Sequence, residues 1–224
     1  MGSMIQLTAA DGHKFGAYKA EPSGKAKGGI VLIQEIFGAN KHIRAVADGY
    51  AKDGYLVIAP ALFDRVSPDM QLGYGPEDQE KGKNTRAQLK WDAVLADTQA
   101  SYEAAKSASG GKVAIIGYCF GGSVAWLGAT RLNFDAAVAY YGGNVADFAE
   151  EKPKCPVICH NGTEDKGIPM EKVEKIKAAR PEVTVYTYEG AGHGFNCDER
   201  GSYHEASAKL ARQRTLDFLA KHIG

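Results

Sequence analysis

The sequence predicts an α/β domain with a mostly parallel central sheet, helices on both faces and an antiparallel hairpin at the N-terminus. Short apolar runs rich in β-branched residues recur along the chain, and such runs are typical of buried parallel strands. Helical segments separate most of these runs, which is the order of elements in a mostly parallel sheet covered on both sides. A length of 224 residues accommodates one large domain with a full core, so we expect a single domain over 1–224.

The first half is expected to hold the hairpin, two core strands and two helices. Asp11-Gly12 joins two alternating segments and is a strong hairpin signal, which predicts an antiparallel pair at one edge of the sheet. Asn40 can cap the first helix, and Asp53-Gly54 can end it. The expected strands are 4–8, 14–20, 29–33 and 56–59, and the expected helices are 41–53 and 89–107.

The stretch from Phe63 to about Arg86 interrupts this alternation. It is rich in proline, glycine and charge and shows little periodicity. We expect a long surface loop here, of the kind that carries ligand contacts in many proteins.

The second half continues the alternation of strand and helix. Pro169 stands in the first turn of one expected helix, where proline is tolerated. The closing helix places apolar or small side chains on one face at helical spacing, namely Ala208, Ala211, Thr215, Phe218 and Leu219. The expected strands are 113–116, 136–140, 156–160 and 184–188, and the two helices before the closing one are 123–130 and 169–179.

Cys119 stands in a Gly-x-Cys-x-Gly-Gly motif between an expected strand and an expected helix. Strand, sharp turn and helix are the context of a nucleophile elbow, and glycines two residues before and after the central residue leave room for the tight turn. The positive helix end favours a thiolate, which is the nucleophilic form of cysteine. The alternative is a tight turn whose Cys119 is only a small buried apolar residue. The motif by itself leaves the two interpretations about level.

Asp165 and His193 follow two later strands, at 156–160 and 184–188. Catalytic groups gather at the carboxyl ends of parallel strands, and the order nucleophile, acid, histidine is the chain order of α/β-hydrolases. Taken alone, His193 could be an ordinary loop histidine and Asp165 a turn or capping residue, with Glu164 beside it. The three residues together, each after a strand, predict a Cys119-His193-Asp165 triad.

At this point the sequence resembles the dienelactone hydrolase (carboxymethylenebutenolidase) family over nearly its whole length. The Cys-bearing elbow and the Gln-Glu-Ile-Phe-Gly segment are the most specific features. The matching segments are Gln34–Gly38, Gly117–Gly122, Tyr140–Gly143, Asn161–Asp165 and Gly190–Phe195. The resemblance implies an α/β-hydrolase fold without a large cap, and hydrolysis of small esters or lactones without a cofactor.

The expected mechanism starts with attack of Cys119 on the ester carbonyl, with His193 handling the proton and Asp165 orienting the imidazole. The backbone N–H of Phe120 would stabilise the oxyanion, and water would then cleave the thioester acyl-enzyme. By resemblance, the N–H of Ile36 is the second oxyanion donor. By resemblance too, Glu35 helps to deprotonate the cysteine when substrate arrives; an equally weighted alternative is a loop ion pair with an arginine.

Substrate recognition departs from the family pattern. Dienelactone enzymes hold a substrate carboxylate with arginines and a tyrosine, but Asn196-Cys197 replaces the arginine expected shortly after the histidine, and Arg200 follows slightly later. Arg86 and Tyr141 are the candidate substrate-binding residues. Arg86 could equally be a surface charge. The dienelactone substrate is therefore in doubt, whereas the chemistry is not.

Composition excludes several other classes of function. Lys and Arg together number 27, as do Asp and Glu, and no basic block is interleaved with aromatics, which argues against nucleic acid as a partner. No run has membrane-spanning length, and no motif typical of zinc or nucleotide sites occurs, so we expect neither metal nor cofactor. The expected partner is a small-molecule ester or lactone, and the protein is expected to be a monomer or a small homo-oligomer.

The four cysteines do not form a disulfide framework, and Cys155 and Cys159 are expected to be small core residues. We therefore expect a cytoplasmic protein. Residues 1–3 resemble a cloning remnant ahead of a native Met4, which leaves open whether a targeting segment preceded it.

Two other functions compete with hydrolysis. The same fold could be a non-enzymatic ligand-binding or thiol-sensing module, although a sensor needs no ordered acid and histidine. A peptidase or acyltransferase could use the same three residues, but the short chain leaves little room for an extended substrate groove.

Overall fold

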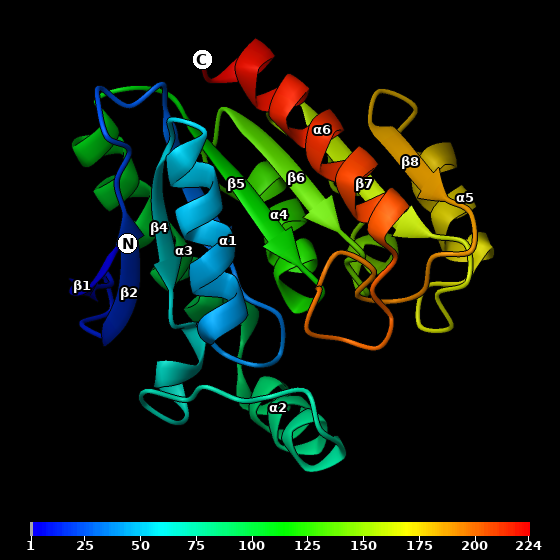
Figure 1. The fold of residues 1–224 in the computed structure, drawn as a ribbon, viewed down its shortest axis with the longest axis horizontal. Coiled ribbons are helices and arrows are strands. Elements are labelled where there is room, and N and C mark those ends of the chain that lie inside the picture. The colour runs from blue at the N-terminus through cyan, green and yellow to red at the C-terminus, as the bar shows by residue number, and fades with distance from the viewer. Residues whose placement is uncertain (1) are drawn as a thin grey trace. The chain divides into compact units, whose positions relative to one another are not determined.

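The computed structural model describes residues 2–224, and the chain divides into two compact units (Figure 1). The first unit runs up to Ala114 and includes Ile223, and the second comprises Ile115–His222 with Gly224. Strand β5 (Val113–Tyr118) begins in the first unit and continues into the second. The single domain predicted from the sequence stays a prediction.

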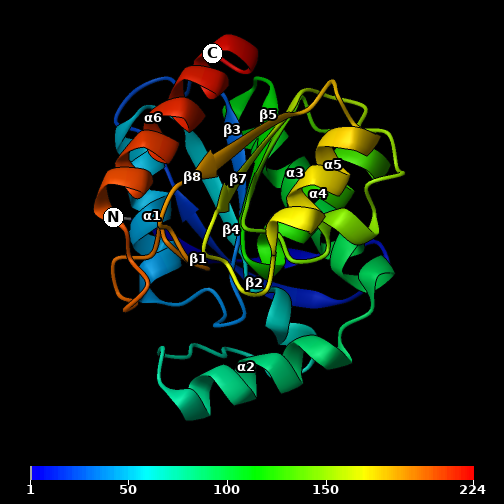
Figure 2. The same cartoon turned by 90° about the vertical axis from the view of Figure 1, so that its right-hand side faces the viewer.

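The first unit contains the predicted hairpin and two parallel core strands. Its strands are β1 (Ser3–Thr8), β2 (Lys14–Ala20), β3 (Gly29–Ile33) and β4 (Leu56–Pro60), in the hydrogen-bonded order β1-β2-β4-β3. Its helices are α1 (Lys41–Lys52), the short 3₁₀ helix η1 (Leu62–Arg65), α2 (Pro76–Gln88) and α3 (Trp91–Ser109). The pairs β1–β2 and β2–β4 are antiparallel, and β3–β4 is parallel. Helices α1 and α3 cover opposite faces of these strands, and α2 lies beyond the carboxyl end of β4 (Figures 1 and 2).

The second unit is built on parallel strands. Its strands β6 (Ala136–Tyr140), β7 (Val157–Gly162) and β8 (Thr184–Tyr188) follow β5 in the order β5-β6-β7-β8, and β6–β7 and β7–β8 are parallel pairs. Its helices are α4 (Phe120–Arg131), the short η2 (Val145–Asp147), α5 (Met170–Ala179) and α6 (Glu205–His222). Helix α6 lies on one face of the strands, and α4 and α5 lie on the other (Figures 1 and 2). The α/β class with an N-terminal hairpin is thereby confirmed.

The prediction of an irregular loop over 63–86 was wrong. This segment contains η1 and the 13-residue helix α2, which starts at Pro76 with Glu77 and Asp78 in its first turn. Proline at the start and acids beside the positive helix end favour a helix locally. Only Gly82 and Thr85 of α2 are buried, so the helix lacks the apolar stripe by which a helix is recognised in a sequence. The other element boundaries were predicted to within three residues.

The segment that contains η1 and α2 holds the loop after β3. The side-chain oxygen of Gln34 accepts a hydrogen bond from the Leu62 N–H at 3.1 Å, and the Phe37 carbonyl accepts one from the Leu72 N–H at 2.9 Å. Gly82 of α2 packs directly against the carbonyl oxygen of Ile36, where a β-carbon would collide. The Gln-Glu-Ile-Phe-Gly loop is therefore braced from outside the sheet.

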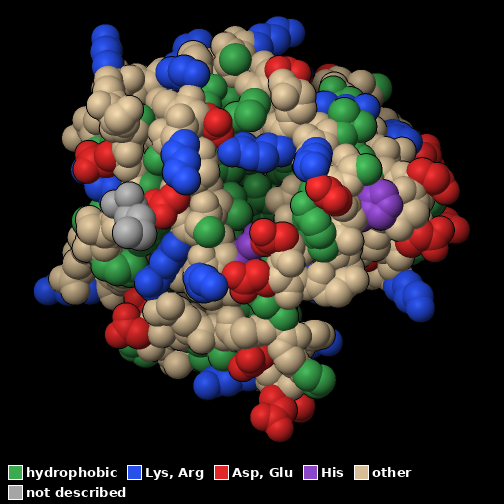
Figure 3. All heavy atoms as spheres, viewed as in Figure 1, with side chains coloured by type: hydrophobic (Ala, Val, Ile, Leu, Met, Phe, Trp, Pro, Cys, Tyr) green, Lys and Arg blue, Asp and Glu red, His purple; other side chains and the backbone are tan. Residues whose placement is uncertain are grey.

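Opposite charges lie close together on one face of the molecule. Lys, Arg, Asp and Glu side chains are interspersed on the face shown in Figure 3, in keeping with a formal net charge of zero. None of the helices in the described part of the chain combines the length and hydropathy that a membrane span needs.

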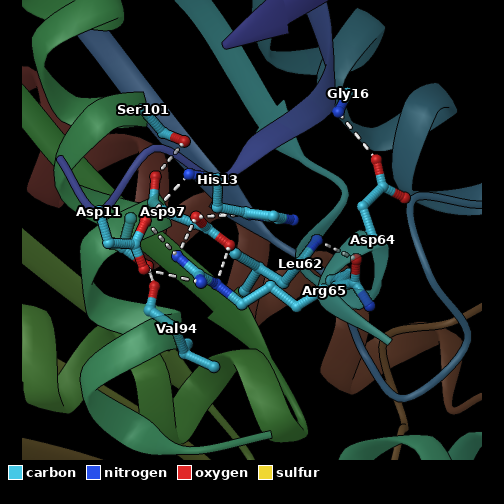
Figure 4. Close-up of polar contacts among 11 residues, drawn as sticks. Asp11, His13, Gly16, Leu62, Asp64, Arg65, Val94, Asp97 and Ser101 are labelled. Atoms are coloured by element: carbon cyan, nitrogen blue, oxygen red, sulfur yellow. Dashed lines mark hydrogen bonds and ion pairs between the residues drawn. The ribbon is translucent and has the colours of Figure 1, made fainter. Parts of the chain in front are cut away.

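A buried ion-pair cluster ties the hairpin, η1 and α3 together in the first unit (Figure 4). Asp97 of α3 is fully buried and receives two hydrogen bonds from Arg65, at 2.8 and 2.7 Å. Arg65 also binds Asp11 at the hairpin turn at 2.8 Å, and His13 Nδ1 lies 3.1 Å from Asp97. Burial raises the pKa of Asp97 although Arg65 and His13 act in the opposite direction. The buried carboxylate therefore depends on its cationic partner.

We expect Arg65→Ala to destabilise the protein by about 3–5 kcal/mol, because it leaves the Asp97 carboxylate buried without its main counter-ion. Urea unfolding at neutral pH measures the change. Asp11→Asn is the matched control: Asp11 is exposed, so its removal from the same arginine should leave the unfolding free energy nearly unchanged. Equal effects of the two substitutions would contradict this account.

Candidate functional site

Cys119 lies at the sharp turn between β5 and α4. Its backbone has φ = 56°, a conformation that non-glycine residues rarely adopt and that the surrounding packing must hold. Gly117 packs directly against the backbone of Gly121, and a β-carbon on Gly122 would lie 2.5 Å from the Tyr140 carbonyl oxygen. The Cys119 N–H donates to that same carbonyl at 3.0 Å. The elbow therefore sits directly on the end of β6, and its side chain is half-buried.

Asp165 lies in the loop after β7 and is 2% exposed. One carboxylate oxygen accepts hydrogen bonds from the N–H groups of Gly167 and Ile168, at 2.9 and 3.1 Å. The other oxygen lies 2.7 Å from His193 Nδ1. Burial acts to raise the pKa of Asp165, but the hydrogen bond and charge of His193, with the two amides, lower it below the usual range. Glu164, the neighbouring candidate, is exposed.

His193 joins the other two predicted residues. Its ring is hydrogen-bonded to Asp165 through Nδ1 and also interacts with the Cys119 sulfur. Burial acts to lower the pKa of His193, but the hydrogen bond to Asp165, followed by the hydrogen bond and charge of Cys119, raises it to about 10. At neutral pH the site thus holds an imidazolium between a carboxylate and a sulfur.

Backbone hydrogen bonds fix the loop of the acid to the loop of the histidine. The Glu164 N–H donates to the Ala191 carbonyl at 2.9 Å, and the Thr163 N–H donates to the Tyr188 carbonyl at 3.0 Å. The Thr163 hydroxyl accepts from the Gly190 N–H at 3.0 Å. The spacing between Asp165 and His193 is therefore set by the backbone as well as by the side-chain bond.

Tyr141, a predicted substrate-binding residue, contacts the ring of His193. Its ring centroid lies 5.2 Å from that of His193 in an edge-on arrangement and 5.5 Å from that of Phe195. Tyr141 is 1% exposed and has φ = 37°, so its position is enforced by packing.

Glu35, Ile36 and Arg86 belong to the first unit. Glu35 follows β3 directly and is 1% exposed, and Ile36 is half-buried against Gly82. The Arg86 guanidinium lies 4.2 Å from the Trp91 ring centroid and donates to the Leu89 carbonyl at 3.2 Å, and burial lowers its pKa. These contacts hold the Arg86 side chain at the end of α2, and its function in substrate binding stays a prediction.

Arg200 was noted in the sequence as an arginine displaced from the family position. In the second unit its guanidinium lies against the backbone of Gly194, the residue after His193, with Cζ 2.6 Å from where a β-carbon would stand. Gly194 has φ = 78°, which suits glycine and allows this close approach. The loop between Gly194 and Arg200 thus brings the Arg200 guanidinium close to the backbone next to His193.

A buried polar group near the site was missed from the sequence. His160 of β7 is fully buried and hydrogen-bonded to Tyr188 at 2.7 Å and to Thr215 at 3.2 Å. The sequence showed only a histidine at the end of an apolar strand. Its neighbours, Tyr140 and Tyr186, become visible only when the register of β6, β7 and β8 is known.

The environments of Cys155 and Cys159 do not favour a reactive thiolate. Cys159 is buried as predicted, whereas Cys155 is half-buried, and burial raises the pKa of each thiol to about 12. No group of three or more His, Cys, Asp or Glu side chains within residues 2–224 is arranged to hold a metal ion.

Comparison with known proteins gives one consistent family. The model of the dienelactone hydrolase family matches residues 15–223. A carboxymethylenebutenolidase of Pseudomonas putida is 33% identical over 228 residues, covering 96% of this chain and 95% of its own. A Synechocystis protein assigned the same activity is 36% identical over 215 residues, covering 88% of this chain and 87% of its own. The crystal structure of a Klebsiella pneumoniae protein assigned as a dienelactone hydrolase superposes with a TM-score of 0.84 at 32% identity, over 98% of this chain and 100% of that one. The α/β-hydrolase fold expected from the sequence is confirmed.

The raised pKa of His193 predicts a specific dependence of stability on pH. An unfolded histidine titrates near 6.5, so between about 6.5 and about 10 the folded imidazole keeps a proton that the unfolded imidazole has lost. The stabilisation from this proton should be complete below pH 6.5 and should be lost as the pH rises through the folded pKa. Urea unfolding of Cys119→Ala and of Cys119→Ala/His193→Gln at pH 6, 8 and 10 isolates it, because no thiol then titrates beside the ring and the hydrogen bond to Asp165, which raises the pKa most, remains. A difference that stays constant over this range would contradict the raised pKa.

Proposed function

The chain belongs to the dienelactone hydrolase family, and we propose that it hydrolyses small esters or lactones through Cys119, His193 and Asp165. The observation that carries the proposal is the arrangement around one ring: His193 is hydrogen-bonded to a buried carboxylate on one side and interacts with the elbow sulfur on the other. Hydrolysis of esters or lactones is the activity that the family and its relatives support; the triad is the proposed means.

Cys119 reacts as a thiolate paired with the imidazolium of His193. The sulfur adds to the ester carbonyl, the leaving alkoxide takes the proton from His193, and a thioester acyl-enzyme remains. Neutral His193 then removes a proton from water, which attacks the thioester and releases the acid and the thiolate. Asp165 keeps Nδ1 protonated and stabilises the imidazolium throughout.

The backbone N–H of Phe120, the first residue of α4, is a proposed donor to the oxyanion, because it follows the nucleophile directly at the positive end of a helix. The N–H of Ile36 is the second proposed donor, by analogy with the family. Glu35 is proposed, again by analogy, to assist deprotonation of Cys119 on substrate binding.

Arg200 is the cation that we propose for recognition of a substrate carboxylate. Its contact with Gly194 brings the guanidinium within one residue of His193, whereas Arg86 is engaged by Trp91 and Leu89. Tyr141, in contact with the His193 ring, is proposed to line the site. A cytoplasmic location and a monomer or small homo-oligomer are part of the same proposal.

A thiol-sensing module is the second candidate, since Cys119 is half-buried on a strained elbow. The buried Asp165 with its three hydrogen-bond donors favours catalysis, because a sensor thiol does not require an oriented histidine. Peroxide-rate oxidation of Cys119 without hydrolysis across an ester panel would favour the sensor.

Cys119→Ala should lower hydrolysis of aryl acetates and small lactones by about 10⁴-fold or more, because the covalent route is lost. Steady-state rates on the purified variant measure this, with circular dichroism to show that it is folded. Cys155→Ala is the matched control, since that thiol is protonated at working pH and should contribute nothing to turnover. Unchanged turnover in Cys119→Ala would end the proposal.

Arg200→Gln should lower kcat/KM for esters that carry a free carboxylate by about tenfold or more, the equivalent of one charge-assisted hydrogen bond. A neutral ester of the same size should be hydrolysed at nearly the wild-type rate. Parallel kinetics on the two substrates distinguish recognition from support of the loop: an equal loss on both would show that Arg200 only braces Gly194.

A further inference from the structure

A chain of four buried polar side chains links strands β6, β7 and β8 to helix α6; we refer to it as the imidazole chain. Tyr188 Oη lies 2.7 Å from His160 Nδ1, His160 Nε2 lies 3.2 Å from Thr215 Oγ1, and Thr215 Oγ1 lies 2.7 Å from Tyr140 Oη. Tyr188 is 3% exposed and the other three are fully buried. None of the four has a function in the chemistry proposed above.

The charge state of His160 limits how the imidazole chain can be hydrogen-bonded. Burial, with the nearby charge of Arg214, lowers the pKa of His160 to about 3, so the ring is neutral and has one N–H. A neutral ring donates through one nitrogen and accepts at the other, so Tyr188 and Thr215 have opposite roles toward it. Thr215 also shares a hydrogen bond with Tyr140, so that both ring nitrogens and all three hydroxyls have a partner within the imidazole chain. Each of the four side chains is hydrogen-bonded to the next, so the position of each limits that of its neighbour.

The two phenols at the ends of the imidazole chain contact the residue that anchors the histidine loop. Phe195, two residues after His193, is fully buried, and its ring centroid lies 5.0 Å from that of Tyr188 and 6.4 Å from that of Tyr140. Tyr141 closes the arrangement, 5.5 Å from Phe195 and 5.2 Å from His193. The rings of Tyr188 and Tyr140 that contact Phe195 are thus held in place by the hydrogen bonds of their hydroxyl groups.

We propose that His160 is a positioning residue for His193: it fixes the hydroxyls of Tyr188 and Tyr140, and the rings of these tyrosines hold Phe195 and with it the histidine loop. The inference rests on the proposed role of His193 and concerns the same site. The imidazole chain does not touch substrate or take part in proton transfer. It sets where the imidazole of His193 stands relative to Cys119 and Asp165.

The test compares two single-hydroxyl removals on one strand. Tyr188→Phe keeps the ring against Phe195 but removes the partner of His160 Nδ1. Tyr186→Phe removes a hydroxyl outside the imidazole chain from a ring that also stacks on His160, with centroids 5.5 Å apart. We expect Tyr188→Phe to lower kcat for a neutral aryl ester by about tenfold or more, with KM little changed, because small displacements of reacting groups are costly. Tyr186→Phe should behave as the wild type.

A second pair of variants tests the imidazole chain on the other side of His160, in case Tyr188→Phe folds poorly. Thr215→Val removes the hydroxyl while nearly keeping the shape, and Thr215→Ser retains the hydroxyl. The valine variant should lose kcat as Tyr188→Phe does, and the serine variant should restore it. Circular dichroism and thermal unfolding establish that the variants compared are folded.

The deciding readout does not depend on turnover. The proton shared by His193 Nδ1 and Asp165, across 2.7 Å, should give a low-field NMR resonance. We expect this resonance to move or broaden in Tyr188→Phe and Thr215→Val and to stay in place in Tyr186→Phe. Unchanged kcat and an unchanged resonance in both of the former would overturn the inference. Absence of ester hydrolysis in the wild type would overturn the proposed function instead, and the resonance would still test the positioning.

Discussion

The hydrogen bond between Asp165 and His193 is the interaction on which the second unit's site depends. A carboxylate that is 2% exposed is costly unless it is paired, and here three N–H groups surround it. Two of them come from the aspartate's own loop, which fixes the carboxylate before the histidine is considered. The third is the Nδ1–H of His193 itself, and the carboxylate that accepts it raises the pKa of the imidazole. The charge state of His193 therefore follows from the way the loop after β7 holds Asp165. The bond also joins the segments after β7 and β8, which are far apart in the sequence.

The elbow is maintained by steric packing rather than by charge. The φ of 56° at Cys119 is strained for a residue with a β-carbon, at a cost of order 1–3 kcal/mol. It persists because Gly117 lies on the backbone of Gly121 and Gly122 lies on the end of β6, so that no relaxed turn would fit. Strain at the sulfur and charge on the imidazole therefore have separate origins. Cys119 and His193 lie at the same edge of the sheet because β5, β6, β7 and β8 are neighbouring strands whose carboxyl ends share that edge.

Local signals in the sequence were enough for most elements and indicated the members of the proposed triad. Asp11-Gly12 gave the hairpin, and Asn40 caps α1 by accepting from the Ile43 N–H, as its position before an amphipathic segment predicts. Cys119, Asp165 and His193, the residues of the proposed triad, stood out in the sequence because each follows a strand. Helix α2 did not stand out, because it packs through the small residues Gly82 and Thr85 and is favoured by its ends rather than by an apolar face. The position of Arg200 beside Gly194 and the hydrogen bonds of His160 could not be predicted for another reason, because the path of a loop and the neighbours of a strand depend on the tertiary structure.

The imidazole chain shows what such tertiary facts add. A core of apolar side chains at these four positions would be no less stable in principle, since replacing both partners of a buried hydrogen bond by apolar groups can be nearly neutral. Removing one partner alone leaves the fully buried His160 unsatisfied, at about 1–3 kcal/mol. Such a chain gains little free energy from being polar, but it admits one arrangement of its rings, whereas an apolar core admits several. In the proposed mechanism His193 must lie close to both the Cys119 sulfur and the Asp165 carboxylate. A single arrangement of the buried rings that support its loop would favour this position.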